Sequence, residues 1–125
     1  MSYIKIWIHL VWSVKYREPL LTENIRPRVL RHIRENARDK GICLDEVNAV
    51  TDHLHCLVFL KQDQTVAQVA KLIKGESAFW INQNKLIAGH FGWQREYFAS
   101  SVGEPDLQKV RRYIQNQEAH HGETH

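Results

Sequence analysis

The chain has 125 residues, with 17 Lys and Arg against 14 Asp and Glu, and its formal net charge is +3 at pH 7. Its 43% hydrophobic and 25% charged residues are typical of a folded globular domain, which excludes a mainly disordered chain. No apolar stretch approaches the roughly 20 residues of a membrane-spanning helix and no secretory signal follows Met1, so we expect one domain over residues 1–125, in the cytoplasm and without a membrane partner.

Apolar residues recur with a period of two in some segments and near 3.6 in others, which divides the chain into seven expected elements. Asn24 and Thr65 fit helix caps, and Gly41 fits a helix stop. Cys43 and Cys56 fall in two expected strands, where we expect buried, reduced thiols and no disulfide. In chain order, the expected elements are strand, helix, strand, strand, helix, strand and helix, over residues 3–14, 24–40, 42–50, 53–60, 66–83, 93–102 and 105–119.

The first six elements have the order of the split β-α-β unit of ferredoxin-like folds. We therefore predict an α+β fold in which an antiparallel sheet carries helices on one face and an added C-terminal helix follows. This topology occurs with many unrelated functions, so the function has to be argued from particular side chains.

His53 and His55 lie two residues apart on an expected strand, so both side chains leave the same face of the sheet. Two imidazoles at this spacing can bind one metal ion. Because the chain contains eight histidines, such a pair also arises by chance. The alternative is two partly exposed histidines on a sheet face.

Tyr113 and Gln117 lie four residues apart on the last expected helix, at the margin of its apolar stripe. A boundary tyrosine beside an exposed glutamine is one interpretation. The other combines them with the two histidines into a phosphodiester-cleaving site. There, magnesium or manganese would be held by two imidazoles and an amide oxygen, and the tyrosine hydroxyl would attack phosphorus.

With these residues in place, the sequence resembles the single-tyrosine HUH transposases of small prokaryotic insertion sequences, in which a hydrophobic residue separates two histidines. The resemblance runs nearly end to end. Thr51 and the segments 96–97 and 100–101 depart from the family's usual residues, but none belongs to the proposed catalytic set. The segments that carry the resemblance are residues 9–17, 52–58, 71–75 and 113–121.

The resemblance implies a DNA transposase, a metal-dependent nuclease and strand transferase that acts on single-stranded DNA with hairpin ends. It implies that Tyr113 forms a 5′-phosphotyrosine intermediate, that the strand is resealed without a nucleotide cofactor, and that the protein is a homodimer. The metal ligands would be His53, His55 and Gln117. Two alternatives stay open: a non-catalytic hairpin-binding relative, and a metal-dependent phosphodiesterase that uses water.

Positive charge is concentrated at the N-terminal end, where residues 1–40 contain nine basic and four acidic side chains. Three arginines of the first expected helix share one face at i, i+3 and i+7 spacing. Such a face can be simply solvated, but the resemblance favours contacts with DNA phosphates. The predicted DNA-binding residues are Arg31, Arg34, Arg38, Lys71, Lys74, Arg111 and Arg112.

Other residues have two open interpretations. If the first and third strands are neighbours, His9 shares a face with His53 and His55, where it is either a structural histidine or a contact of the metal ligands or the phosphate. Trp12 is expected in the core, although aromatic residues can also stack on unpaired bases. His120 and His121 recur in the resembling family, and a solvated C-terminal end is their alternative.

Overall fold

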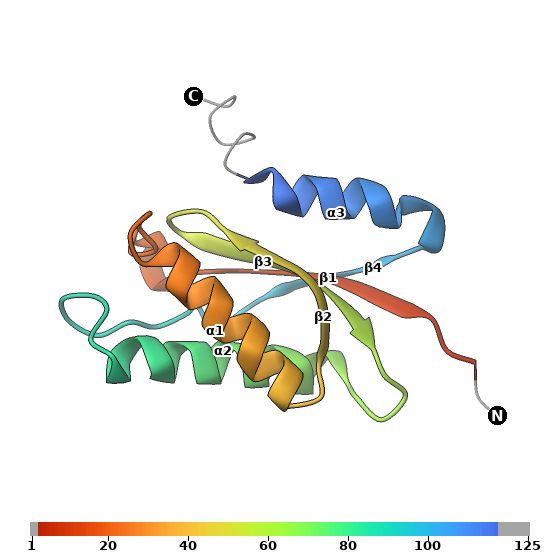
Figure 1. Cartoon of the computed structure of the whole chain (residues 1–125), viewed down its shortest axis with the longest axis horizontal. Helices are drawn as coiled ribbons and strands as arrows, with labels where there is room; N and C mark the ends of the chain where they lie inside the picture. Colours follow the sequence, from red (N-terminus) through yellow and green to blue (C-terminus); the bar gives the residue numbers. More distant parts are fainter. Residues whose placement is uncertain (1–2, 118–125) are drawn as a thin grey trace.

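Four strands form one antiparallel sheet in the computed structural model, which describes residues 3–117. The sheet order is β2-β3-β1-β4, so β1 lies between β3 and β4 (Figure 1). The strands are β1 (Ile6–Ser13), β2 (Cys43–Ala49), β3 (His53–Leu60) and β4 (Phe98–Val102). The helices are α1 (Arg26–Asp39), α2 (Val66–Gln83) and α3 (Leu107–Gln115), with short 3-10 turns η1 (Lys15–Arg17) and η2 (Glu104–Asp106).

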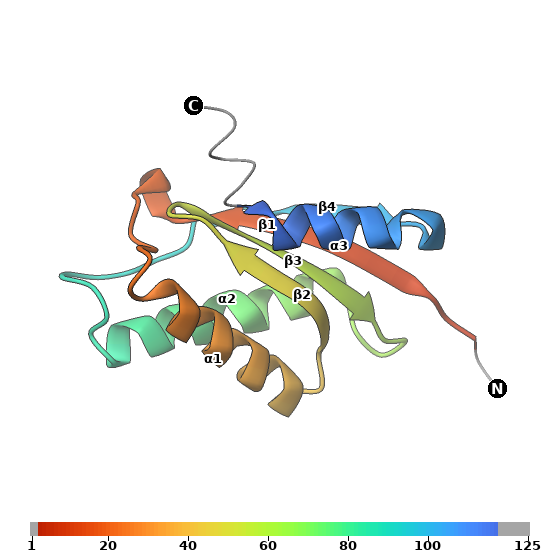
Figure 2. The same cartoon turned by 45° about the horizontal axis from the view of Figure 1, so that its top comes forward.

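The helices lie on both faces of the sheet. Figures 1 and 2 show α1 and α2 together on one face and α3 on the opposite face. The strand order and the connections are those of the predicted ferredoxin-like unit, and α3 is the added helix. The predicted fold class is therefore confirmed.

Strict alternation along β1 and β3 explains why both faces of the sheet are covered. Leu10 and Trp12 of β1 and Leu54 of β3 point into the main core beneath α1 and α2. The alternate residues of both strands point to the opposite face of the sheet. On that face, Leu57 packs with two residues of α3, Leu107 and Ile114. Trp12 is thus a core residue, as expected.

The start of α2 and the end of α1 follow local sequence signals. Thr65 caps α2 with a reciprocal pair of hydrogen bonds to Gln68, and α2 has the predicted bounds. Gly41 adopts φ +74° just after α1, a conformation that glycine reaches without strain. The predicted start of α1 was two residues early, since the cap is Ile25 and no side chain caps this helix.

The fourth strand is shorter than predicted because the ladder is interrupted between Trp93, which forms a single bridge to Val14, and Phe98, where β4 begins, while residues 93–95 also contact α2. Trp93 donates from Nε1 to Ser77 Oγ at 2.9 Å, and Lys74 Nζ donates to the carbonyls of Gln94 and Arg95, both at 2.8 Å. The helical stretch predicted over 105–119 begins as η2 and ends as α3 at Gln115. His120 and His121 lie outside the described residues.

The two cysteines differ in burial. Cys56 is buried as expected, and burial raises the pKa of its thiol. Cys43 is exposed, so the expectation of a buried thiol was wrong there, because Cys43 stands opposite Phe59 and therefore faces away from the main core. None of the helices between residues 3 and 117 is long and apolar enough to cross a membrane.

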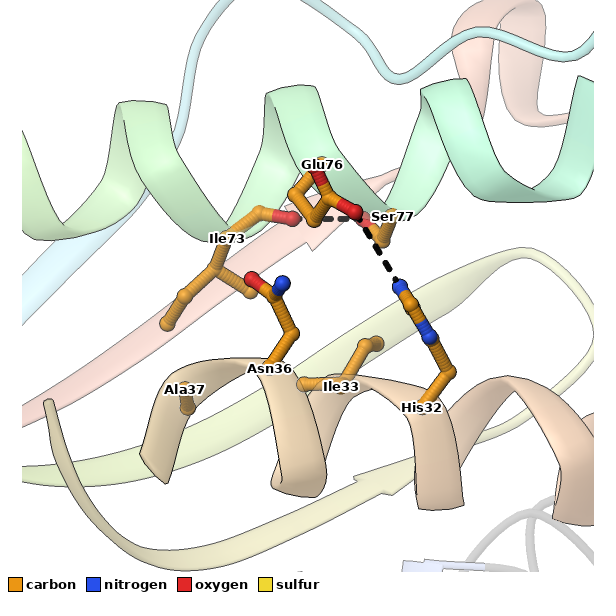
Figure 3. Close-up of a pocket in the computed structure, with 7 residues that line it drawn as sticks. All are labelled: His32, Ile33, Asn36, Ala37, Ile73, Glu76 and Ser77. Atoms are coloured by element: carbon orange, nitrogen blue, oxygen red, sulfur yellow. Dashed lines mark hydrogen bonds and ion pairs between the residues drawn. The ribbon is translucent and has the colours of Figure 1, made fainter. Parts of the chain in front are cut away.

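The seam between α1 and α2 is closely packed. Figure 3 shows His32 of α1 reaching toward Glu76 of α2, with Nε2 3.4 Å from the carboxylate Oε1. The His32 ring also stacks on Trp80 at a centroid distance of 4.3 Å, and Ile33 and Ile73 are buried beneath it. These contacts hold α1 and α2 together on one face of the sheet. The candidate site residues described below lie on the opposite face.

Candidate active site

β3 presents His53 and His55 on the face of the sheet that α3 covers. Their rings are 5.1 Å apart between centroids, and His55 is only 6% exposed. The pairing of Val11 with His55 places both histidines on the same face as the odd-numbered residues of β1. The structure therefore brings the predicted histidine pair together.

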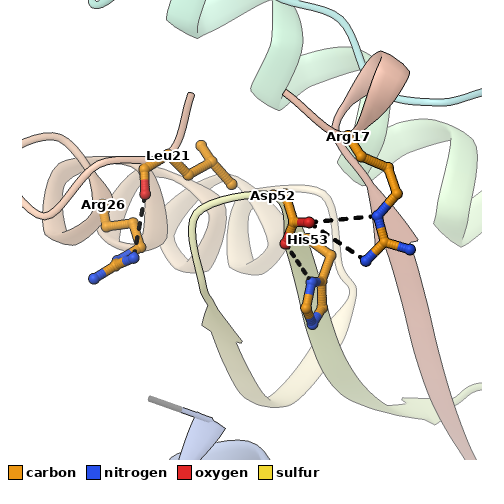
Figure 4. Close-up of polar contacts among 5 residues, drawn as sticks. All are labelled: Arg17, Leu21, Arg26, Asp52 and His53. Atoms are coloured by element: carbon orange, nitrogen blue, oxygen red, sulfur yellow. Dashed lines mark hydrogen bonds and ion pairs between the residues drawn. The ribbon is translucent and has the colours of Figure 1, made fainter. Parts of the chain in front are cut away.

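An acidic residue next to this pair orients His53 (Figure 4). His53 Nδ1 lies 2.7 Å from Asp52 Oδ1, and Arg17 donates from Nε and Nη2 to Asp52 Oδ2, both at 3.3 Å. Burial of Asp52 disfavours its charged form, but the contacts with His53 and Arg17 outweigh this effect and hold its pKa below the usual value. Asp52 is therefore an anion that accepts a hydrogen bond from His53.

The sequence interpretation assigned no role to Arg17, and a local backbone feature explains its position. Tyr16 and Arg17 have φ values of 61° and 55°, a left-handed conformation that is uncommon for residues other than glycine. Two such residues in succession turn the chain after β1 sharply, so that the Arg17 guanidinium reaches Asp52. Neither composition nor periodicity signals such a turn.

Tyr113 of α3 lies over the histidines of its own chain. Its ring centroid is 5.6 Å from that of His55 and 6.1 Å from that of His9, in edge contacts in both cases. His9 Nε2 in turn lies 3.0 Å from His55 Nδ1. Tyr113 is 42% exposed, so a substrate can reach it from solvent.

Gln117 follows Tyr113 by one helical turn and is 1% exposed. Its Nε2 donates to the Tyr113 carbonyl at 2.8 Å, a bond within its own helical segment. Within residues 3–117, no group of three or more His, Cys, Asp or Glu side chains is placed to hold a metal ion. A metal at His53 and His55 therefore needs a donor of another type, and the Gln117 amide oxygen is the predicted one.

Polar residues of β2 fasten α3 above the sheet. Asn48 Nδ2 donates to the carbonyls of Ile114 and Gln115 at 2.9 and 3.2 Å, which satisfies two carbonyls at the end of the helix. Arg111 forms a two-point contact with Asp45 at 2.8 and 3.0 Å. Together with the packing of Ile114 against Leu57, these bonds fix the distance of α3 from the sheet and the rotation of the helix about its axis.

The predicted DNA-binding residues do not form one patch. Those of α1 and α2 lie on one side of the sheet, and Arg111 and Arg112 lie on the other. Three of the seven side chains are engaged within the protein, since Arg34 donates to the Val47 carbonyl at 3.2 Å and the contacts of Lys74 and Arg111 are those given above. The other four are exposed: Arg31, Arg38, Lys71 and Arg112.

A groove between β4 and α3 opens beside Tyr113. Ser100 stands opposite His9 in the β1–β4 register, and Lys109 of α3 lines the other wall. The sequence interpretation missed both residues, because only the docking of α3 over β4 brings them to the tyrosine. The groove offers a hydroxyl and a cation next to the reactive side chain.

The chain is similar in sequence to known proteins. Residues 2–117 match the family model described as "Transposase IS200 like". The chain is 27% identical over 115 residues to the ISDra2 transposase TnpA of Deinococcus radiodurans, which covers 87% of this chain and 81% of that protein. It is 25% identical to the transposase for insertion sequence element IS200 of Salmonella typhimurium, with 87% of this chain and 74% of the relative covered.

Two solved structures have the same fold. A crystal structure of a Deinococcus radiodurans R1 protein assigned as a transposase superposes with a TM-score of 0.75 at 25% identity, covering 93% of each chain. A REP-associated tyrosine transposase bound to a REP hairpin superposes with a TM-score of 0.70 at 20% identity, covering 98% of this chain and 72% of the other. The match of the family model over nearly all of the described residues shows that the chain belongs to the family of IS200-like transposases.

Proposed function

We propose that this transposase cleaves and rejoins single-stranded DNA at the ends of an insertion sequence through a 5′-phosphotyrosine intermediate on Tyr113. The observation that carries the proposal is the position of Tyr113, exposed to solvent and in edge contact with His55 above the paired histidines. A hydroxyl nucleophile beside a site for a cation is the arrangement that phosphoryl transfer to a side chain requires.

The side chains at the site fit a divalent cation. Asp52 holds the Nδ1 side of the His53 ring, as carboxylates commonly do with metal-binding histidines. His53, His55 and Gln117 would hold the ion, and their neutral donors leave the phosphate oxygens to complete its coordination, which suits magnesium or manganese. When bound, the metal would polarise the scissile phosphate and stabilise its developing charge.

Tyr113 carries out the proposed strand cleavage. The Tyr113 hydroxyl oxygen attacks phosphorus and loses its proton, the bond from phosphorus to the 3′ oxygen breaks, and the leaving strand takes up a proton as a free 3′-hydroxyl. The reverse attack by a 3′-hydroxyl on the phosphotyrosine reseals DNA. Since the phosphodiester energy is kept in the tyrosine ester, no ATP is needed.

The form of the DNA and the oligomeric state belong to the same proposal. A hairpin substrate is supported by the relative whose structure contains a REP hairpin. A homodimer is supported by β4, an edge strand with four of its five residues exposed, among them Phe98 at 60%. Such an edge pairs readily with another chain.

The test uses single-stranded DNA from the flanks of the gene, labelled at either end and incubated with the protein and magnesium or manganese. We expect the 3′-labelled strand to migrate with the protein on a denaturing gel, and the 5′-labelled fragment to run free with a 3′-hydroxyl that a polymerase can extend. EDTA should prevent both products. Hairpin binding without any cleavage would leave a binding protein, and a protein-linked 5′-labelled fragment would contradict the proposed polarity.

Salt dependence tests the phosphate contacts separately. We expect hairpin affinity to fall steeply with salt, and replacement of Arg31 or Arg38 by alanine to reduce the slope of log K against log salt by about 0.7 to 0.9 each. Lys61→Ala removes an exposed charge outside the predicted set and should leave the slope unchanged. Fluorescence anisotropy at several salt concentrations gives the slopes, and equal slopes for all variants would remove these arginines from the interface.

A further inference from the structure

We propose that His9 is a positioning residue of the active site, whose Nε2 accepts the Nδ1 hydrogen of His55 and so fixes the tautomer in which His55 offers Nε2 to the metal. The inference rests on the proposed metal-dependent function, but the contact between the two histidines can be measured without metal. It assigns a role to a side chain of β1 that the proposed mechanism does not use.

Strand register brings the two rings together. In the β1–β3 pairing, Val11 stands opposite His55 and His9 stands opposite Leu57, so His9 and His55 are diagonal neighbours on one face. Diagonal side chains of an antiparallel pair lie within reach when they are aromatic. The rings stack at a centroid distance of 5.2 Å with an interplanar angle of 29°, and Nε2 of His9 lies 3.0 Å from Nδ1 of His55.

The 3.0 Å contact fixes which nitrogen of His55 would face the metal. Nδ1 of His55 faces His9, so a metal would bind His55 through Nε2, which then carries no hydrogen. A neutral imidazole has one donor nitrogen and one acceptor nitrogen. With Nε2 of His9 as the acceptor, His55 must carry its hydrogen on Nδ1, which leaves the lone pair on the Nε2 side of its ring.

His9 therefore has the same relation to His55 that Asp52 has to His53. Both partners contact Nδ1 of a predicted metal ligand, one as a carboxylate and one as an imidazole. Such outer partners fix ring orientation and tautomer, and their loss typically weakens metal binding 10- to 100-fold. The His9 ring is also in edge contact with the Tyr113 ring, so one side chain contacts both the proposed nucleophile and a predicted metal ligand.

The test compares two substitutions at residue 9 in the full chain. His9→Gln keeps an oxygen that can accept from His55, whereas His9→Phe keeps a ring of similar size without an acceptor. We expect His9→Phe to weaken Mn²⁺ binding, followed by electron paramagnetic resonance, about 10- to 100-fold. His9→Gln should remain within a few-fold of the wild type. His32→Gln, at the seam between α1 and α2, is the matched control and should bind Mn²⁺ normally.

A second measurement separates this inference from the proposed function. Nitrogen-15 NMR of the metal-free protein should show His55 as the Nδ1–H tautomer in the wild type and His9→Gln, and as a mixture in His9→Phe. His55 with its hydrogen on Nε2 in the wild type, or equal losses of Mn²⁺ affinity in both variants, would overturn the role of His9. Absence of a covalent DNA product would instead refute the proposed function, while the tautomer would still report the histidine contact.

Discussion

Tyr113→Phe should eliminate the protein-linked DNA and reduce strand cleavage by about 10⁴-fold or more, as expected for loss of a nucleophile. The substitution removes one oxygen and keeps the ring whose edge contacts His9 and His55. We therefore expect folding and hairpin affinity to remain within about twofold of the wild type, since the ring contacts with the two histidines are kept. The measurement is single-turnover cleavage of end-labelled DNA on a denaturing gel.

Tyr16→Phe is the matched control, because Tyr16 is also an exposed tyrosine near the site but lies on η1, and it should form the adduct at the normal rate. The result also decides between the alternatives left open by the sequence. Cleavage that survives in Tyr113→Phe would assign the attack to water at the metal. Hairpin binding without cleavage in the wild type would identify a non-catalytic relative.

Ile114→Ala should release α3 from the sheet while the rest of the domain stays folded. Ile114 is fully buried against Leu57, and such truncations cost about 2 to 5 kcal/mol. A nine-residue helix is marginal by itself, so the loss should appear as undocking of α3. At about 1.4 kcal/mol per factor of ten, the undocked population rises roughly 30-fold or more. Hydrogen exchange of the α3 amides measures this population.

Ile33→Ala provides the comparison, because Ile33 is equally buried but belongs to the main core under α1. It should lower the thermal unfolding midpoint of the whole domain, whereas Ile114→Ala should mainly increase exchange in α3 and slow cleavage. If both variants lowered one common transition by the same amount, α3 would unfold together with the sheet and the separate docking step would be refuted.

Much of the fold was predictable because its signals are local. Alternation in β1 and β3 and the Thr65 cap of α2 gave the sheet faces and a helix with correct bounds. The limits of β4 were not predictable, since Trp93 still forms a bridge to Val14 and the ladder is interrupted only between Trp93 and Phe98, where residues 93–95 contact α2. The exposure of Cys43 likewise depends on its register opposite Phe59, which only the assembled sheet decides.

The candidate site was predictable where its residues share one element. His53 and His55 follow from the period of a strand, and Tyr113 and Gln117 from that of a helix. Their partners come from distant segments and carry no such signal. Arg17 reaches Asp52 through two left-handed residues, and Asn48 meets the end of α3 across the sheet.

The central place of β1 also has a consequence for the order in which the protein is made. Trp7 of β1 pairs with Val102 of β4, so β1 is synthesised well before the strand that completes its ladder. Pairing with β3 comes earlier and already assembles both histidines. Because domains fold as the chain emerges, a product of interrupted translation that stops before α3 would carry the histidine pair without the tyrosine. On the mechanism proposed above, such a fragment would form no covalent link to DNA.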